Sequence, residues 1–133
     1  MRRLIILFAS IAVAIFIAGN AFAASTLPAQ TVSASGVTVK VTPQSLSDQS
    51  WNFEIAFDTH SGALSDDLTK SAVLIAAGGA TSPPVSWQGD PPGGHHRKGV
   101  LRFKPFAAQP PSIELQIKRP GETVPRSFRW QLK

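Results

Sequence analysis

The chain has 133 residues and no cysteine. Disulfide bonds, thiolate metal ligands and a lipid-anchored form are therefore excluded. Met1 is the only methionine, so no methionine cluster is available to bind a metal. The sequence also lacks internal repeats and any extended helical period, which argues against helical and repeat architectures.

The first residues have the pattern of a bacterial export signal. Arg2 and Arg3 precede an apolar run over 4–19, and the small-x-small sequence Ala-Phe-Ala follows at 21–23. This pattern predicts a signal peptide over 1–23, cleaved before Ala24, and a periplasmic or secreted protein that meets the membrane only before cleavage. The alternative is an uncleaved anchor, because the apolar run is of borderline length for spanning a bilayer.

Residues 24–133 are enough for one domain with a single core. The small and polar stretch 24–36 predicts a flexible leader, which leaves 37–133 as the domain.

Charge is divided unevenly along the chain. Without Arg2 and Arg3 the net charge is +3, with two cations and six acids over 24–96 but nine cations and two acids over 97–133. One interpretation is that the two parts lie together in one fold and attract each other. The other is a basic patch for an anionic partner.

Apolar and polar residues alternate in short segments, as they do in half-buried strands. The strongest example is Trp51, Phe53, Ile55 and Phe57. Residues 71–77 instead form a continuous apolar run, typical of a strand covered on both faces. Turn-forming residues separate the seven predicted strands, at 37–41, 51–57, 71–77, 85–87, 101–104, 113–117 and 127–132. This pattern predicts an all-β fold, an antiparallel immunoglobulin-like β-sandwich, with a small β-barrel as the alternative.

One short piece, residues 65–70, has helical character. Ser65 is placed to cap a single turn, and Asp66 and Asp67 suit its positive end.

Two segments concentrate the unusual polar residues, and both fall between predicted strands. Residues 58–62 read DTHSG and contain His60, and residues 89–98 read GDPPGGHHRK and contain His95 and His96. These are all the histidines of the chain. Together the two loops are the expected functional surface.

Imidazole is the commonest metal ligand, so His60, His95 and His96 define a candidate copper or zinc site, with Asp58 or Asp90 as an oxygen ligand. Adjacent histidines on a strand point to opposite faces, so His95 and His96 could share an ion only on a loop. The alternative is that these histidines only bond the loop backbone or face water. Beside them, Arg97 and Lys98 with the glycine amides could bind an anion. The candidate binding surface comprises Trp87, Asp90, Arg97, Lys98, Arg102 and Lys104.

No catalytic motif is present. Asp58-Thr59-His60 has histidine where the aspartic-protease turn requires glycine, and no serine lies on a nucleophile elbow. We therefore expect a protein that is not an enzyme.

Cations on the later strands predict a solvated basic sheet face. Nucleic-acid binding is not expected there, because the aromatic residues have the opposite, core-facing parity. The predicted face comprises Arg102, Lys104, Lys118, Arg119, Arg126 and Arg129.

The segments FDTHSGALSDDL and W…GDPPGGHHRKGVLRF, within residues 51–104, resemble small exported bacterial proteins of uncharacterised function that carry a Thr-His-Ser block and a Gly-Gly-His-His-Arg block in this order. The resemblance implies a compact β domain and no particular mechanism. We therefore expect an exported, non-enzymatic binding or accessory module, whose partner is another exported protein or an anionic surface.

Overall fold

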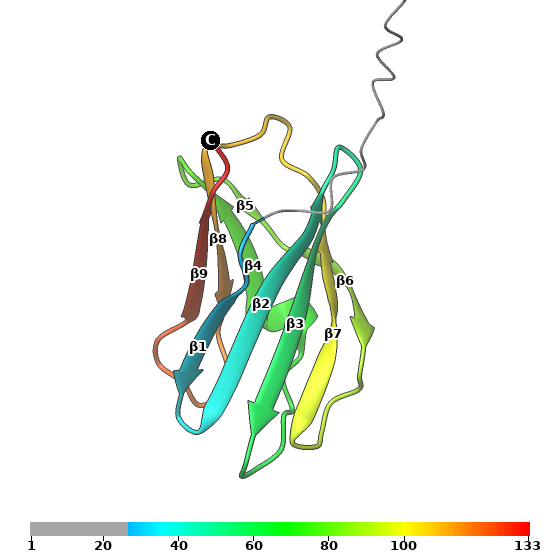
Figure 1. Cartoon of the computed structure of the whole chain (residues 1–133), viewed down its shortest axis with the longest axis vertical. Helices are drawn as coiled ribbons and strands as arrows, with labels where there is room; N and C mark the ends of the chain where they lie inside the picture. Colours follow the sequence, from blue (N-terminus) through cyan, green and yellow to red (C-terminus); the bar gives the residue numbers. More distant parts are fainter. Residues whose placement is uncertain (1–26) are drawn as a thin grey trace, which may run out of the picture.

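The computed structural model describes residues 27–133, which form two antiparallel β-sheets packed face to face (Figure 1). The predicted signal peptide and its cleavage site before Ala24 lie outside the described residues. The predicted β-sandwich is confirmed, and the barrel alternative is wrong because the two sheets remain separate. The elements are β1 Gln30–Ala34, β2 Val37–Leu46, β3 Trp51–Thr59, α1 Leu68–Ser71, β4 Ala72–Ala76, β5 Thr81–Ser82, β6 Pro84–Gly89, β7 His96–Phe103, β8 Ser112–Ile117 and β9 Arg126–Gln131.

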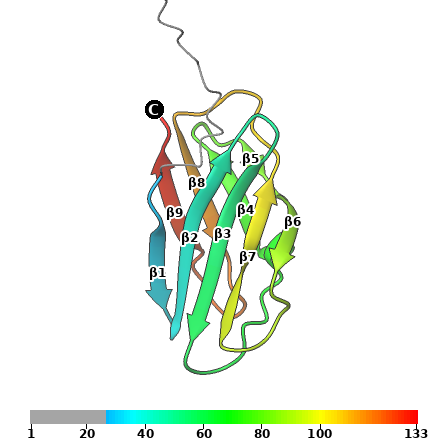
Figure 2. The same ribbon diagram turned by 45° about the vertical axis from the view of Figure 1, so that its right-hand side comes forward.

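The five-stranded sheet has the order β1-β2-β3-β7-β6, and the four-stranded sheet has the order β5-β4-β8-β9. Figure 2 shows the four-stranded sheet behind the five-stranded one. Four connections lie at one end of the sandwich, at the bottom of Figure 1: the β1–β2 turn and the β3–α1, β6–β7 and β8–β9 loops. We call it the histidine end, because His60, His95 and His96 lie there.

Alternating apolar side chains from both sheets fill the core. Phe53 and Phe57 on β3 are almost completely buried, as are Leu115 on β8 and Phe128 on β9. The Phe53 ring lies 5.6 Å from that of Trp130, so the two sheets meet at an aromatic contact. Each such side chain contributes about 1.5–3 kcal/mol through removal from water.

The predicted flexible leader over 24–36 is wrong for residues 30–34, which form β1 and pair with β2. The segment lacks the alternating large apolar residues of the other strands, and Val32 is its only half-buried aliphatic residue. Main-chain pairing with β2 and hydrogen bonds between the Gln30 side chain and the β9 main chain hold it in place instead. Gln30 Oε1 accepts from Arg129 N at 2.9 Å, and Gln30 Nε2 donates to Arg129 O.

The short helix begins two residues later than predicted. Asp67, not Ser65, is its N-cap and accepts from Thr69 N at 3.1 Å, while Asp66 turns into the protein. Ser71 ends α1, so β4 starts at Ala72 rather than at Ser71. Within residues 27–133, no helix is long and apolar enough to cross a membrane.

The loop predicted over 89–98 is shorter in the structure. Gly89 ends β6, and residues 96–98 belong to β7, where His96 pairs with Asp58 and Lys98 with Ala56 of β3. Only residues 90–95 connect the two strands.

Candidate functional site

Three main-chain hydrogen bonds hold the β3–α1 loop against the β6–β7 loop. Thr59 N donates to His95 O at 2.9 Å, Leu64 N to Gly94 O at 3.2 Å, and Gly93 N to Leu64 O at 2.7 Å. Gly93 and Gly94 have φ values of 119° and 72°, which glycine adopts without a steric penalty. The two segments singled out in the sequence therefore lie side by side.

Asp58 and His96 form a pair at the edge of this surface. They are cross-strand neighbours on β3 and β7, and His96 Nδ1 lies 2.5 Å from Asp58 Oδ1. With the carboxylate ionised, the imidazole donates its Nδ1 proton. The side chains are 78% and 57% exposed, so water competes for the same hydrogen bond and the pair contributes little to stability.

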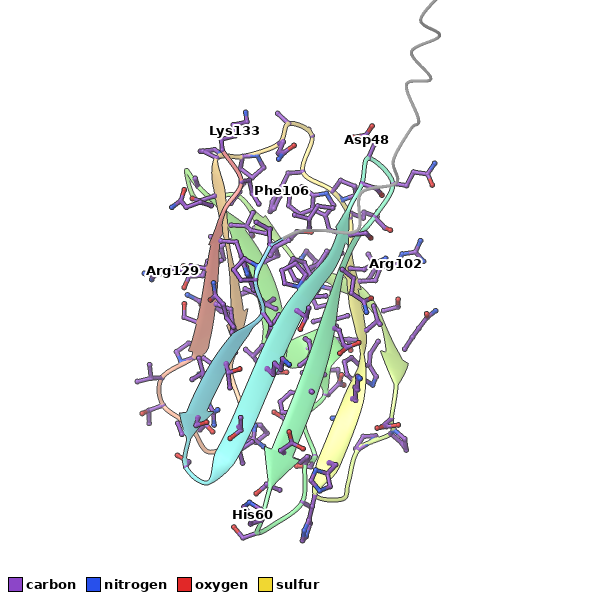
Figure 3. All side chains as sticks on the ribbon, viewed as in Figure 1. Asp48, His60, Arg102, Phe106, Arg129 and Lys133 are labelled. Carbon is purple, nitrogen blue, oxygen red and sulfur yellow. The ribbon has the colours of Figure 1, made fainter. Side chains whose placement is uncertain are left out.

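His60 and His95 are exposed in the two loops. Figure 3 shows His60 at the tip of the histidine end, with Asp48, Phe106 and Lys133 at the opposite end. Among residues 27–133, no group of three or more His, Cys, Asp or Glu side chains is arranged to hold a metal ion. The structure thus brings Asp58 to His96 but does not assemble these two with His60 and His95 into a metal centre.

Arg97 lies inside the protein rather than on the predicted binding surface. It is 3% exposed, and its guanidinium lies over the Trp87 ring at 5.2 Å. Nε donates to Asp90 O at 3.1 Å and Nη1 donates to Asp66 O at 2.5 Å. The prediction that Arg97 could bind an anion at the surface is therefore wrong, because its guanidinium is buried and already bonded to main-chain carbonyls.

Trp87 and Asp90 also organise the β6–β7 connection. The half-buried Trp87 donates from Nε1 to Asp90 O at 3.0 Å. The Asp90 carboxylate accepts from Lys98 N at 2.9 Å, and Asp90 N donates to Lys98 O at 3.0 Å. Of the predicted binding residues, Asp90, Lys98, Arg102 and Lys104 are exposed, whereas Trp87 is half-buried and Arg97 is buried.

Beneath the exposed loops lies a buried ion pair that joins the two sheets. Asp66, in the β3–α1 loop, is 1% exposed and Arg119, just after β8, is 9% exposed. Arg119 donates from Nε to Asp66 Oδ2 at 3.0 Å and from Nη2 to Asp66 Oδ1 at 2.9 Å, which is the bidentate geometry of strong guanidinium–carboxylate pairs. Its Nη1 reaches Glu122 at 3.3 Å.

Arg126 extends this arrangement to the β1–β2 turn. Two bonds of 2.8 Å join its Nε and Nη2 to Glu122, and further bonds reach three main-chain carbonyls, those of Val32 (3.1 Å), Ala34 (2.8 Å) and Val37 (2.9 Å). All the connections of the histidine end are therefore tied together. We call this set the arginine network; it comprises Asp66, Arg97, Arg119, Glu122 and Arg126.

The network shifts the pKa of two of its members. Burial favours the neutral form of Arg119, but the hydrogen bonds and charges of Asp66 and Glu122 outweigh it and raise the pKa of Arg119 above its ordinary value. The hydrogen bond from Arg126 lowers the pKa of Glu122 despite the opposing effect of burial, and the charges of Arg126 and Arg119 add to this. Both shifts favour the charged forms on which the network depends.

The prediction that Arg119 and Arg126 belong to a solvated sheet face is wrong, because both are buried. The alternation of apolar and polar residues indicated burial instead. Arg126 has the same parity as the core residues Phe128 and Trp130, and Arg119 has the same parity as Ile117. No pattern in the sequence indicated that Asp66 and Glu122 are the partners of these arginines. Arg102, Lys104, Lys118 and Arg129 are exposed as predicted.

An open groove of about 420 Å³ lies beside the network. It runs between α1 and the β8–β9 loop, and its walls include Lys70, Ser71 and residues 118–122. The histidine end therefore combines projecting loops with a recess next to them.

Comparison with known proteins gives one structural match. No family model and no curated protein matches the sequence. Among solved structures, the chain is similar to a DUF4426 family protein from Pseudomonas aeruginosa PAO1, with a TM-score of 0.49 and 10% sequence identity over 77% of this chain and 96% of that chain.

Proposed function

We propose that this protein is a non-enzymatic binding module, exported to the periplasm or the cell exterior, and that its histidine end contacts another exported protein. The observation that carries the proposal is the arginine network, which ties the loops of this end together beneath exposed polar side chains. Sandwich domains commonly bind through loops gathered at one end.

Preorganisation is the physical reason for choosing this end. Loops that are already fixed lose less conformational freedom on binding than mobile ones, so more of the contact energy appears as affinity. The exposed surface includes Asp58, His60, Pro91, Pro92 and His95. The segments within residues 51–104 that resemble small exported bacterial proteins contain all three histidines of this end.

The chemistry of these residues supports binding rather than catalysis. The Asp58–His96 pair is open to water, and sequence motifs supply no nucleophile for it to activate. The arrangement of the histidines likewise gives no support to the copper or zinc alternative.

Photo-crosslinking in intact cells tests the proposal. A photoreactive phenylalanine analogue in place of His95 is expected to give a discrete adduct with one envelope protein. The same analogue in place of Thr31, which is exposed on β1 away from the loops, is the matched control and is expected to give no such adduct.

The partner, identified by mass spectrometry, is then purified and titrated with the wild-type protein and with a His60→Ala/His95→Ala/His96→Ala variant. Weaker binding by the folded variant supports the proposal. Identical adducts from both crosslinking positions, no adduct from either, or equal affinity of the two proteins would overturn it.

A further inference from the structure

The outer face of the five-stranded sheet has an excess of exposed cations. Lys40 on β2 alternates with the buried Val39 and Val41, and Arg102 on β7 alternates with the buried Leu101 and Phe103, so both point away from the core. We call the set the cationic face; it comprises Lys40, Lys98, Arg102 and Lys104.

The carboxylates on or beside this face already have partners. Glu54 accepts from Gln44 Nε2 at 3.2 Å and lies 3.4 Å from Lys98 Nζ, and Asp58 is paired with His96. The Asp90 carboxylate accepts from a main-chain amide.

Three of the four cations remain available. Among residues 27–133, Lys40, Arg102 and Lys104 form no ion pair, and Asn52 of β3 is the neutral register partner of Arg102. Figure 3 shows Arg102 on the side of the molecule, well away from His60. Arg102 therefore lies apart from the loop tips assigned to the protein partner, and Lys98 is the member of the cationic face nearest the Asp58–His96 pair.

The spacing of the cations decides what kind of anion they suit. Lys40 and Lys98 pair with the same residue, Ala56, from opposite sides, so their backbones are about 10 Å apart. Arg102 lies further along β7, and Lys104 directly follows the end of this strand. Cations distributed over a sheet in this way do not converge on one small anion, but they match a surface that carries many mobile anionic groups.

From this we propose that the cationic face docks on anionic phospholipid headgroups of a membrane. Lipids diffuse laterally, so headgroups can collect beneath fixed cations without any pocket. This orientation leaves the histidine end at the side of the docked molecule, where it remains open to a partner. The proposal does not depend on the identity of that partner.

Vesicle co-sedimentation tests the proposal. The full chain, produced with its own N-terminal segment and purified in the form that the cell processes, is mixed with vesicles of phosphatidylglycerol and phosphatidylcholine in equal parts, or of phosphatidylcholine alone. Binding is expected only with phosphatidylglycerol, and it is expected to disappear at about 1 M salt, where the Debye length is about 3 Å.

Two charge-matched variants separate the face from the net charge. Arg102→Gln/Lys104→Gln is expected to weaken binding by about fivefold for each cation removed. Lys70→Gln/Lys118→Gln removes the same charge from exposed positions outside the face and is expected to bind like the wild type. Circular dichroism checks that both variants are folded.

Equal weakening in the two variants would mean that only net charge matters and would overturn the proposal. Equal binding to vesicles of pure phosphatidylcholine would also overturn the proposal, and so would the absence of binding to both kinds of vesicle. A protein that is retained on a heparin column but does not bind either vesicle would overturn it too. None of these outcomes bears on the crosslinking result, since that experiment probes the other surface.

Discussion

Gly89 and Gly99 face each other across β6 and β7 and leave no room for a side chain. A Cβ atom on Gly99 would lie 2.6 Å from Trp87 Cζ2 and 2.7 Å from Gln88 O. The Trp87 ring therefore packs directly on the β7 backbone, with the Arg97 guanidinium 5.2 Å from its ring centroid. This packing joins the outer strand β6 to the arginine network.

We predict that Gly99→Ala destabilises the protein by about 1–3 kcal/mol, because the added methyl group must displace the indole or the β6 backbone. Urea unfolding followed by tryptophan fluorescence measures the change. Gln88→Ala, at an exposed site on β6, is the control and should stay within about 0.5 kcal/mol of the wild type. A Gly99→Ala protein as stable as the wild type would contradict the steric argument.

The buried arginines show why the residue-level prediction was only partly right. Alternation correctly places Arg126 on the side of Phe128 and Trp130, and Arg97 on the side of Leu101. The general preference of charged residues for water predicts the opposite. Burial prevails because carboxylates and main-chain carbonyls from distant segments meet these guanidinium groups, and those long-range partners leave no local pattern in the sequence.

At the level of elements, the strands that the sequence predicts are those with large apolar residues at every second position. β3 and β9 are examples. β1 was missed because other residues stabilise it: the Gln30 side chain bonds the Arg129 main chain, and Arg126 bonds the carbonyls of Val32 and Ala34. An edge strand held by partners about 90 residues away has no periodicity of its own to detect.

The β8–β9 loop makes the stability of the protein depend on pH. Glu122 has a lowered pKa in the folded protein, mainly through the hydrogen bond from Arg126. A carboxylate of this kind stabilises the fold at pH values above its unfolded pKa, and the contribution is lost as the pH falls through the lower, folded pKa. The loss thus begins near the ordinary value of 4.5 and continues below it.

We predict that Glu122→Gln lowers the free energy of unfolding at pH 7 by about 1.5–3 kcal/mol, since it weakens hydrogen bonds to charged partners. It should also flatten the decline in stability below pH 4.5. Urea unfolding at a series of pH values measures both effects. Asp48→Asn, at an exposed turn at the other end, should leave both unchanged; an acid decline that is equally steep in Glu122→Gln would count against the network.

For the whole molecule, the uneven charge along the chain serves internal attraction in several places. Asp66 from the acidic part pairs with Arg119 from the basic part, and Glu54 from the acidic part pairs with Lys98 from the basic part. The interpretation that the two parts attract each other within one fold accounts for these contacts. Exposed cations remain on the five-stranded sheet, and the second interpretation, a basic patch for an anionic partner, stays a prediction.

The relation between the two histidine loops could be predicted only in part. Both lie beside strands that pair, and the β3–β7 register that places His96 opposite Asp58 is a tertiary property. The sequence therefore identified the loops but not the spacing of His60, His95 and His96. That spacing decides whether zinc can stabilise the folded protein.

A zinc ion held by three histidines of the folded state alone would stabilise that state, by about 2.7 kcal/mol at 100 times its dissociation constant. We predict no such effect, because residues 27–133 contain no group of three suitable donors, and Asp58 is already bonded to His96. Differential scanning calorimetry with and without zinc should give the same unfolding midpoint for the wild type and for His60→Ala/His95→Ala/His96→Ala. A midpoint that rises with zinc in the wild type alone would restore the metal site, because the variant differs from the wild type only in lacking these imidazoles.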